Sequence, residues 1–267
     1  MKPKPQRLLM NLLTAMDEDV LRVRDAISLC ELFGVTSNST RVALTRLSAE
    51  GLIESCGRGQ YQLTARAHTL TDDLRRWRTA LQRLEAWTGQ WVAAHLGGLG
   101  RSDKPALRRR KRALEMNGFQ ELSRDLYIRP DNLRGGVASV RERLYRLGLE
   151  GSAPVFLLSH LDDHYVPRAR NLWDTTGLEQ RYRDTASHLR QWLDQADRLS
   201  PEAAARESFV IGDRAIRQIV FDPLLPEQMI DATARQTFVD TLLTFDQTGH
   251  AIWRRLYHLS AGTTAPT

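Results

Sequence analysis

The sequence predicts an α+β protein with an N-terminal winged helix-turn-helix, a central ferredoxin-like domain and a C-terminal helical domain. Three observations lead to this prediction. Two helical segments and a short hairpin occupy residues 20–64, and strand and helix patterns alternate over residues 90–161. After Tyr165 the pattern is helical, with one proline-rich break. We therefore expect domains at 1–64, 89–166 and 167–267, with residues 65–88 as a connecting amphipathic helix.

The segment after Gly34 has the features of a recognition helix. Thr36-Ser37-Asn38 can cap a first turn, which predicts a helix from about Ser39 to Ala49 that ends at Gly51. One face is apolar and should be buried: Thr40, Ala43, Leu44 and Leu47. The other face is polar and cationic, with no carboxylate between Thr36 and Ala49, and suits base edges in a major groove. We predict that DNA contacts come from Ser37, Asn38, Arg41, Val42, Thr45 and Arg46.

A hairpin follows this helix. Leu52–Ser55 and Gln60–Leu63 have strand patterns, and Cys56-Gly57-Arg58-Gly59 between them predicts a tight turn with a basic tip. A preceding helix over Arg24–Phe33 completes a winged helix-turn-helix. Arg58 at the turn is predicted to contact DNA phosphates. The alternative is an ordinary helix and hairpin with a solvated face.

The other elements follow in order. A leucine stripe predicts a first helix over Gln6–Met16, and Val20–Val23 a short strand. Leucines and tryptophans from Leu70 to Trp87 predict a long connecting helix, packed on the neighbouring domain or paired with a second copy of itself. The remaining segments predict strands at 90–96, 120–128 and 154–161 and helices at 104–116, 137–147, 173–196, 203–220 and 228–259.

Composition limits the classes of protein. The 267 residues carry 38 basic and 32 acidic side chains, and the net charge of +6 suits a polyanionic partner. The surplus lies in the middle, since residues 65–150 hold 18 basic and 10 acidic side chains. Cys30 and Cys56 stand apart, which argues against a disulfide framework or a thiolate zinc site. We find no membrane-spanning run and no signal-peptide pattern, so we expect a cytoplasmic protein.

Several motifs, taken in order along the chain, carry a family resemblance. The most specific is Phe221-Asp222-Pro223-Leu224-Leu225-Pro226. The other matching positions are Asn38, Arg41, Ala43, Arg46-Leu47, Trp91, Arg112–Leu114, Gly118-Phe119, Leu126–Pro130, Leu172-Trp173 and Tyr182. Together they resemble the PaaX-type repressors, named for control of phenylacetate degradation, and the sequence departs from that family at Glu227–Asp231.

This resemblance implies a winged-helix reader, a Cas2-like ferredoxin fold in the middle and a helical C-terminal domain. It also implies a homodimer that represses promoters and is released by an aryl-acetyl-CoA effector, usually phenylacetyl-CoA. Candidate effector contacts are Arg108 and Arg112, which share a helix face, and the aromatic residues Trp173 and Tyr182. The alternatives are a solvated or DNA-contacting cationic helix for the arginines, and core positions for the aromatic residues.

A metal-dependent nuclease is the alternative from another class. His160, Asp162 and His164 would point to one side of an extended strand, and Asp162, Asp163 and His164 would be its key residues. No further histidine or glutamate cluster completes such a site, and the strand at Trp91–Leu96 holds His95 but no carboxylate. We therefore predict a non-enzymatic protein without cofactor or metal, which binds an inverted-repeat operator. A third class, an adaptor that binds protein, is disfavoured because the recognition helix lacks carboxylates.

Overall fold

A computed structural model describes residues 4–15, 20–65, 67 and 76–262. The chain divides into two compact units. Unit 1 holds residues 1–76, 188–214 and 241–267, and unit 2 holds residues 77–187 and 215–240. Three long helices contribute residues to both units: α8 (Thr175–Leu193), α9 (Pro201–Val220) and α10 (Ala232–Gly262). The domain boundaries expected from the sequence stay a prediction.

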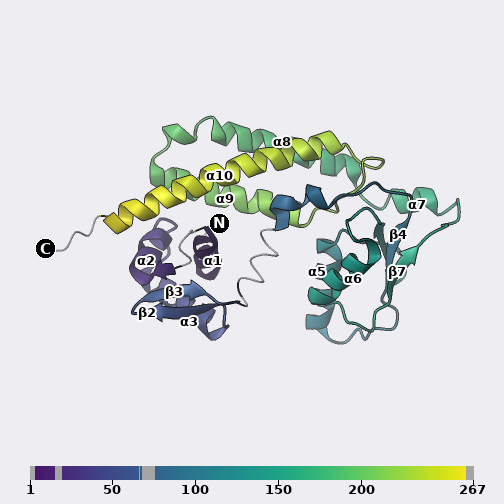
Figure 1. The fold of residues 1–267 in the computed structure, drawn as a ribbon, viewed down its shortest axis with the longest axis horizontal. Coiled ribbons are helices and arrows are strands. Elements are labelled where there is room, and N and C mark those ends of the chain that lie inside the picture. The colour runs from purple at the N-terminus through teal and green to yellow at the C-terminus, as the bar shows by residue number, and fades with distance from the viewer. Residues whose placement is uncertain (1–3, 16–19, 66, 68–75, 263–267) are drawn as a thin grey trace. The chain divides into compact units, whose positions relative to one another are not determined.

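Unit 1 begins with the elements of a winged helix-turn-helix (Figure 1). Their order is α1 (Pro5–Ala15), β1 (Val20–Arg22), α2 (Val23–Glu31), α3 (Ser37–Ala49), β2 (Ile53–Gly57) and β3 (Gln60–Leu63). The three strands form one antiparallel sheet in the order β1-β3-β2. Each of these elements was predicted, although α3 begins two residues earlier than expected, at Ser37.

The core beneath this sheet is apolar. Leu8, Leu9 and Leu13 of α1 are fully buried, as the leucine stripe predicted. Phe33, just after α2, packs edge-on against Phe209 of α9 and stacks on Trp253 of α10, with ring centroids 5.1 and 6.0 Å apart. Arg7 of α1 forms an ion pair with Asp213 of α9. The winged helix-turn-helix elements are therefore packed against the parts of α9 and α10 that belong to unit 1.

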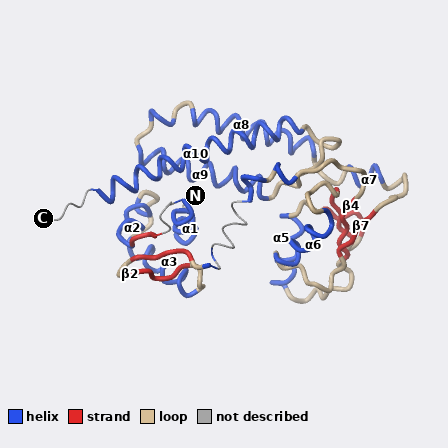
Figure 2. The backbone as a smooth tube through the Cα atoms, viewed as in Figure 1, coloured by secondary structure: helices blue, strands red, loops and turns tan. Residues whose placement is uncertain are grey.

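Unit 2 contains the predicted strand and helix alternation. It runs β4 (Trp91–His95), α5 (Lys104–Met116), β5 (Gln120–Ser123), β6 (Leu126–Pro130), α6 (Gly136–Arg146) and β7 (Val155–Leu158). The sheet order is β5-β6-β4-β7 and every pairing is antiparallel. Figure 2 shows the strands of this sheet in red, with β4 and β7 labelled. This is the ferredoxin-like topology. The segment 120–128, given above as one strand, forms a hairpin of β5 and β6, and its turn holds Asp125 at a φ of 62°.

The prediction of a long connecting helix is wrong over residues 76–88. Two short 3₁₀ turns, Arg76–Thr79 and Leu81–Arg83, are followed by extended chain at Leu84. The backbone here bonds to a distant segment: the Glu85 N–H donates to the Asn132 carbonyl at 2.9 Å, and the Arg134 N–H donates to that of Arg83 at 2.8 Å. These long-range bonds replace helical ones. The earlier part of the predicted helix, residues 66 and 68–75, lies outside the described residues.

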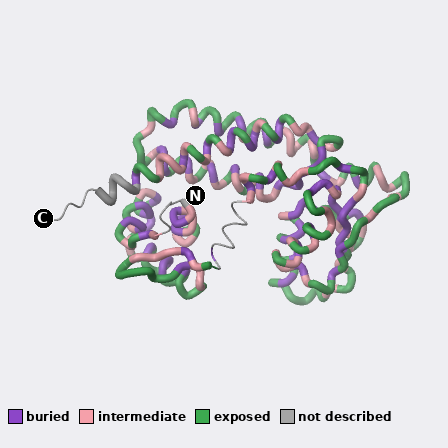
Figure 3. Tube along the Cα trace, in the orientation of Figure 1, coloured by how far each residue is buried: buried purple, intermediate pink, exposed green. Residues whose placement is uncertain are grey.

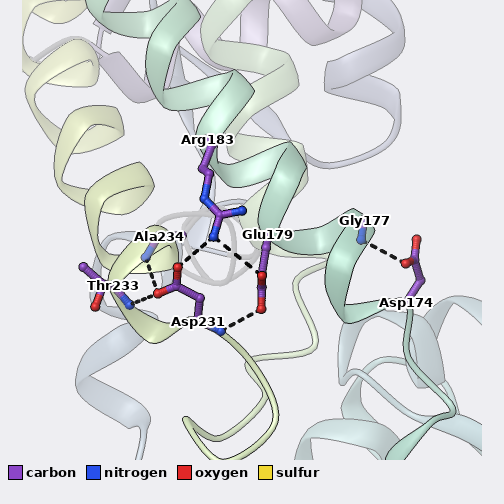
Figure 4. Close-up of polar contacts among 7 residues, drawn as sticks. All are labelled: Asp174, Gly177, Glu179, Arg183, Asp231, Thr233 and Ala234. Atoms are coloured by element: carbon purple, nitrogen blue, oxygen red, sulfur yellow. Dashed lines mark hydrogen bonds and ion pairs between the residues drawn. The ribbon is translucent and has the colours of Figure 1, made fainter.

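Three helices after Tyr165, namely α8, α9 and α10, match predicted helices with shifted bounds. A short helix α7 (Val166–Arg170) and a 3₁₀ turn at Ala196–Arg198 were not predicted as separate elements. Gly177 does not break α8 but lies in its first turn, where its N–H donates to Asp174 Oδ1 at 2.9 Å. Figure 4 shows a similar cap on α10, where Asp231 accepts from Thr233 and Ala234 and also binds Arg183 of α8 at 2.8 Å. The Glu179 carboxylate accepts from the Asp231 N–H, so one short network ties α8 to the start of α10.

Candidate nucleic-acid interface

Helix α3 presents the surface predicted for DNA. Thr36 caps it, since the Thr36 hydroxyl accepts from the Ser39 N–H at 3.2 Å. The apolar face is buried at the four predicted positions, Thr40, Ala43, Leu44 and Leu47. Ser37 is half-buried, and the other predicted α3 contacts are exposed: Asn38, Arg41, Val42, Thr45 and Arg46. The exposed face therefore carries cations and hydrogen-bonding groups and no carboxylate from Ser37 to Ala49.

The arginines on this face are not neutralised by carboxylates. Arg41 donates from Nη1 to the Ser37 hydroxyl at 2.6 Å, which orients the guanidinium and leaves its charge uncompensated. Within the described residues, Arg46 and Arg58 have no side-chain hydrogen bond or ion pair. Thr45 donates to the Arg41 carbonyl at 3.1 Å, so its hydroxyl lies against the helix backbone. The cationic groups thus remain available to a polyanion.

The wing is a compact hairpin. Strands β2 and β3 pair with a bulge between Ser55 and Gly57, and Arg58-Gly59 forms the turn. Gly59 has a φ of +67°, a conformation that a residue with a Cβ rarely adopts. Its carbonyl accepts from the Val23 N–H at 2.9 Å, which joins the wing turn to the first residue of α2. β2 is exposed after Ile53 (Figure 3), and Arg58 lies at the tip.

A groove of about 740 Å³ runs between the wing turn, the start of α2 and the start of α3. Four arginines line it, together with one carboxylate, Glu31: they are Arg22, Arg24, Arg41 and Arg58. Arg24 is in part neutralised, because its Nε lies 3.3 Å from Asp25 Oδ1. The sequence alone did not lead us to predict Arg22 and Arg24 as contact residues. The available signal was their position around the start of a helix, but the β1–β3 register that brings Arg22 opposite Gln60 is a tertiary property.

The candidate effector residues are not brought together. Trp173 lines a groove of about 340 Å³ in unit 2, which Leu178, Arg181, Phe119, Phe221 and Pro223 also line. Tyr182 is fully buried and does not line this groove. Arg108 and Arg112 are exposed on α5 and do not line it either. Of the four, Trp173 alone lines this groove.

A buried polar network explains Tyr182 and the segment Phe221–Pro226. The Tyr182 hydroxyl donates to Asp222 Oδ2 at 2.5 Å, and Asp222 Oδ1 accepts from the Leu224 N–H at 2.8 Å. Burial raises the pKa of Asp222, although the bond from Tyr182 opposes the rise. Burial, reinforced by Asp222, also raises the pKa of Tyr182. Both groups serve the fold, since neither lies at an opening in the surface.

Arg129 is the centre of the same network. Its guanidinium donates to the carbonyls of Pro130 and Asn117 and to Asn132 Oδ1, at 2.7–3.0 Å. Asn132 in turn donates to the Leu224 carbonyl at 2.8 Å. Burial lowers the pKa of Arg129 to about 9, which still leaves it charged at neutral pH. Gly118 approaches so closely that an added Cβ would lie 2.6 Å from Pro223 Cα.

The extended strand that the nuclease alternative needs at residues 160–164 does not form. β7 ends at Leu158, and His160 has a φ of 54°, so His160, Asp162 and His164 do not alternate along an extended strand. The His164 ring instead lies 4.3 Å from that of Tyr165. In the part of the chain that is described, no three His, Cys, Asp or Glu side chains gather as metal ligands. Strand β4 ends at the exposed His95, without a carboxylate.

Two family profiles match the chain. The one described as "PaaX-like protein" covers residues 8–67, and the one described as "PaaX-like protein C-terminal domain" covers residues 173–255. The chain belongs to the PaaX-like family. The two matched PaaX-like regions include the reader helix, the wing and most of α8, α9 and α10.

A relative supports this assignment, and a solved structure shares the fold. The Transcriptional repressor PaaX of Escherichia coli (strain K12) is 27% identical over 237 residues, which cover 80% of this chain and 70% of the relative. The structure of the uncharacterized protein Rv0674 from Mycobacterium tuberculosis is similar with a TM-score of 0.60 and 21% identity, over 94% of this chain and 99% of the other. The second likeness establishes the fold only. No helix in the described part of the chain is long and apolar enough to span a membrane.

Proposed function

We propose that this PaaX-like protein is a DNA-binding transcriptional repressor. Helix α3 lies in a major groove, where Asn38 and Arg41 contact base edges and Val42 and Thr45 contact neighbouring base edges or thymine methyl groups. The observation that carries the proposal is the exposed α3 face, which holds uncompensated arginines and no carboxylate. The repressor activity of the E. coli relative supports the regulatory class.

The groove beside the wing supplies the contacts that do not depend on sequence. Arg58 binds a phosphate at the wing turn, and Arg22 and Arg24 bind phosphates at the start of α2. Outside the groove, Arg46 binds a phosphate beside α3. Two protomers form a homodimer that binds an inverted repeat, with half-sites about one helical turn or a multiple of it apart. This distribution of roles follows from the side chains that α3 presents, since Asn38 and Arg41 are of the types that can distinguish bases.

The effector belongs to unit 2 in this proposal. The groove beside Trp173 is of the size that holds small ligands. Its walls are partly aromatic and aliphatic, and Arg181, Gln120 and the carboxylates of Glu115 and Asp174 also line it. Such a groove suits the acyl part of an aryl-acetyl-CoA, for example phenylacetyl-CoA. The effector releases DNA because it binds the DNA-free state more tightly than the DNA-bound state.

Selection from a pool of random duplexes tests the DNA-binding proposal. The wild-type protein should enrich a two-fold symmetric sequence at 150 mM salt, and Arg41→Ala should enrich a more degenerate one. Arg190→Ala changes an exposed arginine on α8 and serves as the control. Enrichment of no sequence by the wild-type protein would refute the proposal.

The effector is tested on the selected duplex. Phenylacetyl-CoA should release the DNA at lower concentration than acetyl-CoA does. Leu178→Trp, which fills the groove, should abolish release while the affinity for DNA is retained. Equal release of the variant and the wild type would contradict the assignment of the groove.

A further inference from the structure

Helix α5 carries a concentration of charge that the reader domain does not explain. Its thirteen residues, KPALRRRKRALEM, hold six basic side chains and one acidic side chain, Glu115. Solvated helices usually mix both signs on their surface, because opposite charges four residues apart stabilise a helix and like charges destabilise it. The excess on α5 is therefore more than general solubility requires.

Two of the six cations have a partner. Arg110 is buried and binds Glu150 through Nε and Nη2 at 2.7–2.8 Å, and its Nη1 donates to the Gly100 carbonyl at 2.6 Å. This pairing lowers the pKa of Glu150 and raises that of Arg110. Lys111 lies 3.8 Å from Glu115 on the exposed face. Arg110 therefore belongs to the fold, and Lys111 is compensated.

Three of the other four cations form a row. Lys104, Arg108 and Arg112 follow each other at intervals of four residues, so they share one face of the helix, and all three are exposed. In the described residues, none of the three has a side-chain hydrogen bond or an ion pair. Each neighbour in the row repels the next, and Lys104 lies at the helix N-terminus, where the macrodipole disfavours a cation. The row is unfavourable for the isolated protein and becomes favourable opposite a polyanion.

We propose that Lys104, Arg108 and Arg112 bind the phosphate backbone of duplex DNA outside the segment that α3 and the wing contact. The row is about 12 Å long, at a rise of about 1.5 Å per residue. One strand of a duplex places a phosphate about every 3.4 Å along its axis, so the row can face several phosphates at once. Arg109 is not part of this row, because its side-chain stem packs over Gly148. A Cβ added at Gly148 would lie 3.3 Å from Arg109 Cβ.

This proposal rests on the proposed function, because it extends the contact with DNA that the reader makes. It also reassigns Arg108 and Arg112 from the phosphates of a CoA-type effector to those of DNA. Both ligands are phosphate anions. A row of three cations along a helix matches a linear array of charges better than a single small ligand, and none of the three lines the groove beside Trp173.

The test uses two fluorescent duplexes that carry the selected operator, with flanks of either 2 or 15 base pairs on each side. The full-length variant Lys104→Gln/Arg108→Gln/Arg112→Gln is compared with the wild type. Arg190→Gln/Arg198→Gln/Arg206→Gln is the matched control, because it removes the same charge from exposed positions on α8, α9 and the turn between them. Thermal unfolding of all three proteins checks that the exposed substitutions leave the fold intact.

The wild type and the control should bind the long duplex more tightly than the short one. The α5 variant should bind the short duplex like the wild type, and it should lose roughly tenfold in affinity for the long duplex. Its plot of log affinity against log salt on the long duplex should be shallower by about 3, since each phosphate contact contributes about 0.9.

Several outcomes overturn the proposal. Equal affinities of the wild type for both duplexes, or equal losses for the variant and the control, would mean that α5 contacts no flanking DNA. Calorimetric titration with free coenzyme A is a further arm: loss of coenzyme A binding in the α5 variant, with unchanged affinity for the long duplex, would assign the row to a free phosphate ligand. If the wild type enriches no operator, the proposed function itself is wrong. Binding to the short duplex tests that function separately from the contact made by α5.

Discussion

Two regions of this PaaX-like protein use arginine in opposite ways. On α3 and the wing, Arg41, Arg46 and Arg58 are exposed and form no ion pair with a carboxylate in the described chain. In unit 2, Arg129 is 1% exposed and gives hydrogen bonds to two carbonyls and one amide oxygen. The surroundings of a guanidinium, rather than the residue type, therefore decide whether it binds a partner or stabilises the fold.

The largest expected effect concerns the buried arginine. Arg129→Ala leaves the carbonyls of Asn117 and Pro130 and the Asn132 side chain without their donor, and each unsatisfied buried acceptor costs roughly 1–3 kcal/mol. The free energy of unfolding should fall by at least about 3 kcal/mol, as measured by urea denaturation. Arg124→Ala, an exposed change on the β5–β6 turn, should stay within about 0.5 kcal/mol of the wild type. A similar small loss for Arg129→Ala would show that the network does not stabilise unit 2.

The reading arginine should affect DNA affinity and leave stability unchanged. Arg41→Ala removes a side chain held by Ser37 at the start of α3 and should weaken operator binding by about 1–3 kcal/mol. It should also relax the preference at one position of each half-site. Fluorescence anisotropy on a set of singly substituted operators measures both effects. Unchanged discrimination at every position would remove Arg41 from the base-reading residues.

Asp222 extends the comparison to pH. Its pKa is raised by burial, so the folded protein binds this proton more tightly than the unfolded chain does. This contribution to stability is complete below the ordinary aspartate pKa near 3.8 and is lost as pH rises through the higher pKa of the folded state. Asp222→Asn can keep both hydrogen bonds, one to the Leu224 N–H and one to Tyr182, but cannot titrate. As pH rises over this window, the urea midpoint of Asp222→Asn should fall less than that of the wild type. Parallel curves for the two proteins would show that Asp222 is not the titrating group.

The smallest effect is expected at the tip of the wing. Arg58→Ala should weaken binding to operator and random duplex by the same factor, because a phosphate contact carries no sequence information. The salt dependence of log affinity should become shallower by about 1. Gel-shift titrations at four salt concentrations measure this. A loss confined to the operator would place Arg58 at a base edge instead.

Local signals in the sequence predict much of this structure. The cap at Thr36 and the spacing of Thr40, Ala43, Leu44 and Leu47 define α3 and its two faces, since both depend only on neighbouring residues. Lys104–Met116 was predicted as a helix with these same bounds. The winged-helix order and the ferredoxin-like topology also follow from local patterns and from the order of the segments.

Features that depend on distant contacts were not predictable in this way. Residues 76–88 have a helical stripe, yet Glu85 and Arg83 bond to the segment around Asn132, almost fifty residues away. His160 leaves the strand pattern through a positive φ that its sequence does not signal. The groove at Arg22 and Arg24 depends on how β1 pairs with β3, and the role of Tyr182 depends on Asp222, forty residues later.

The hydrogen bond from the Val23 N–H to the Gly59 carbonyl has a consequence for the energetics of recognition. It fixes the wing turn against the first residue of α2 in the DNA-free protein. The arginines that line the groove between the wing turn, α2 and α3 are therefore preorganised. Little backbone entropy is then lost when a duplex binds, and more of the electrostatic attraction remains as affinity. Variation in wing length would disturb this hydrogen bond, and would therefore reduce affinity even if every arginine were retained.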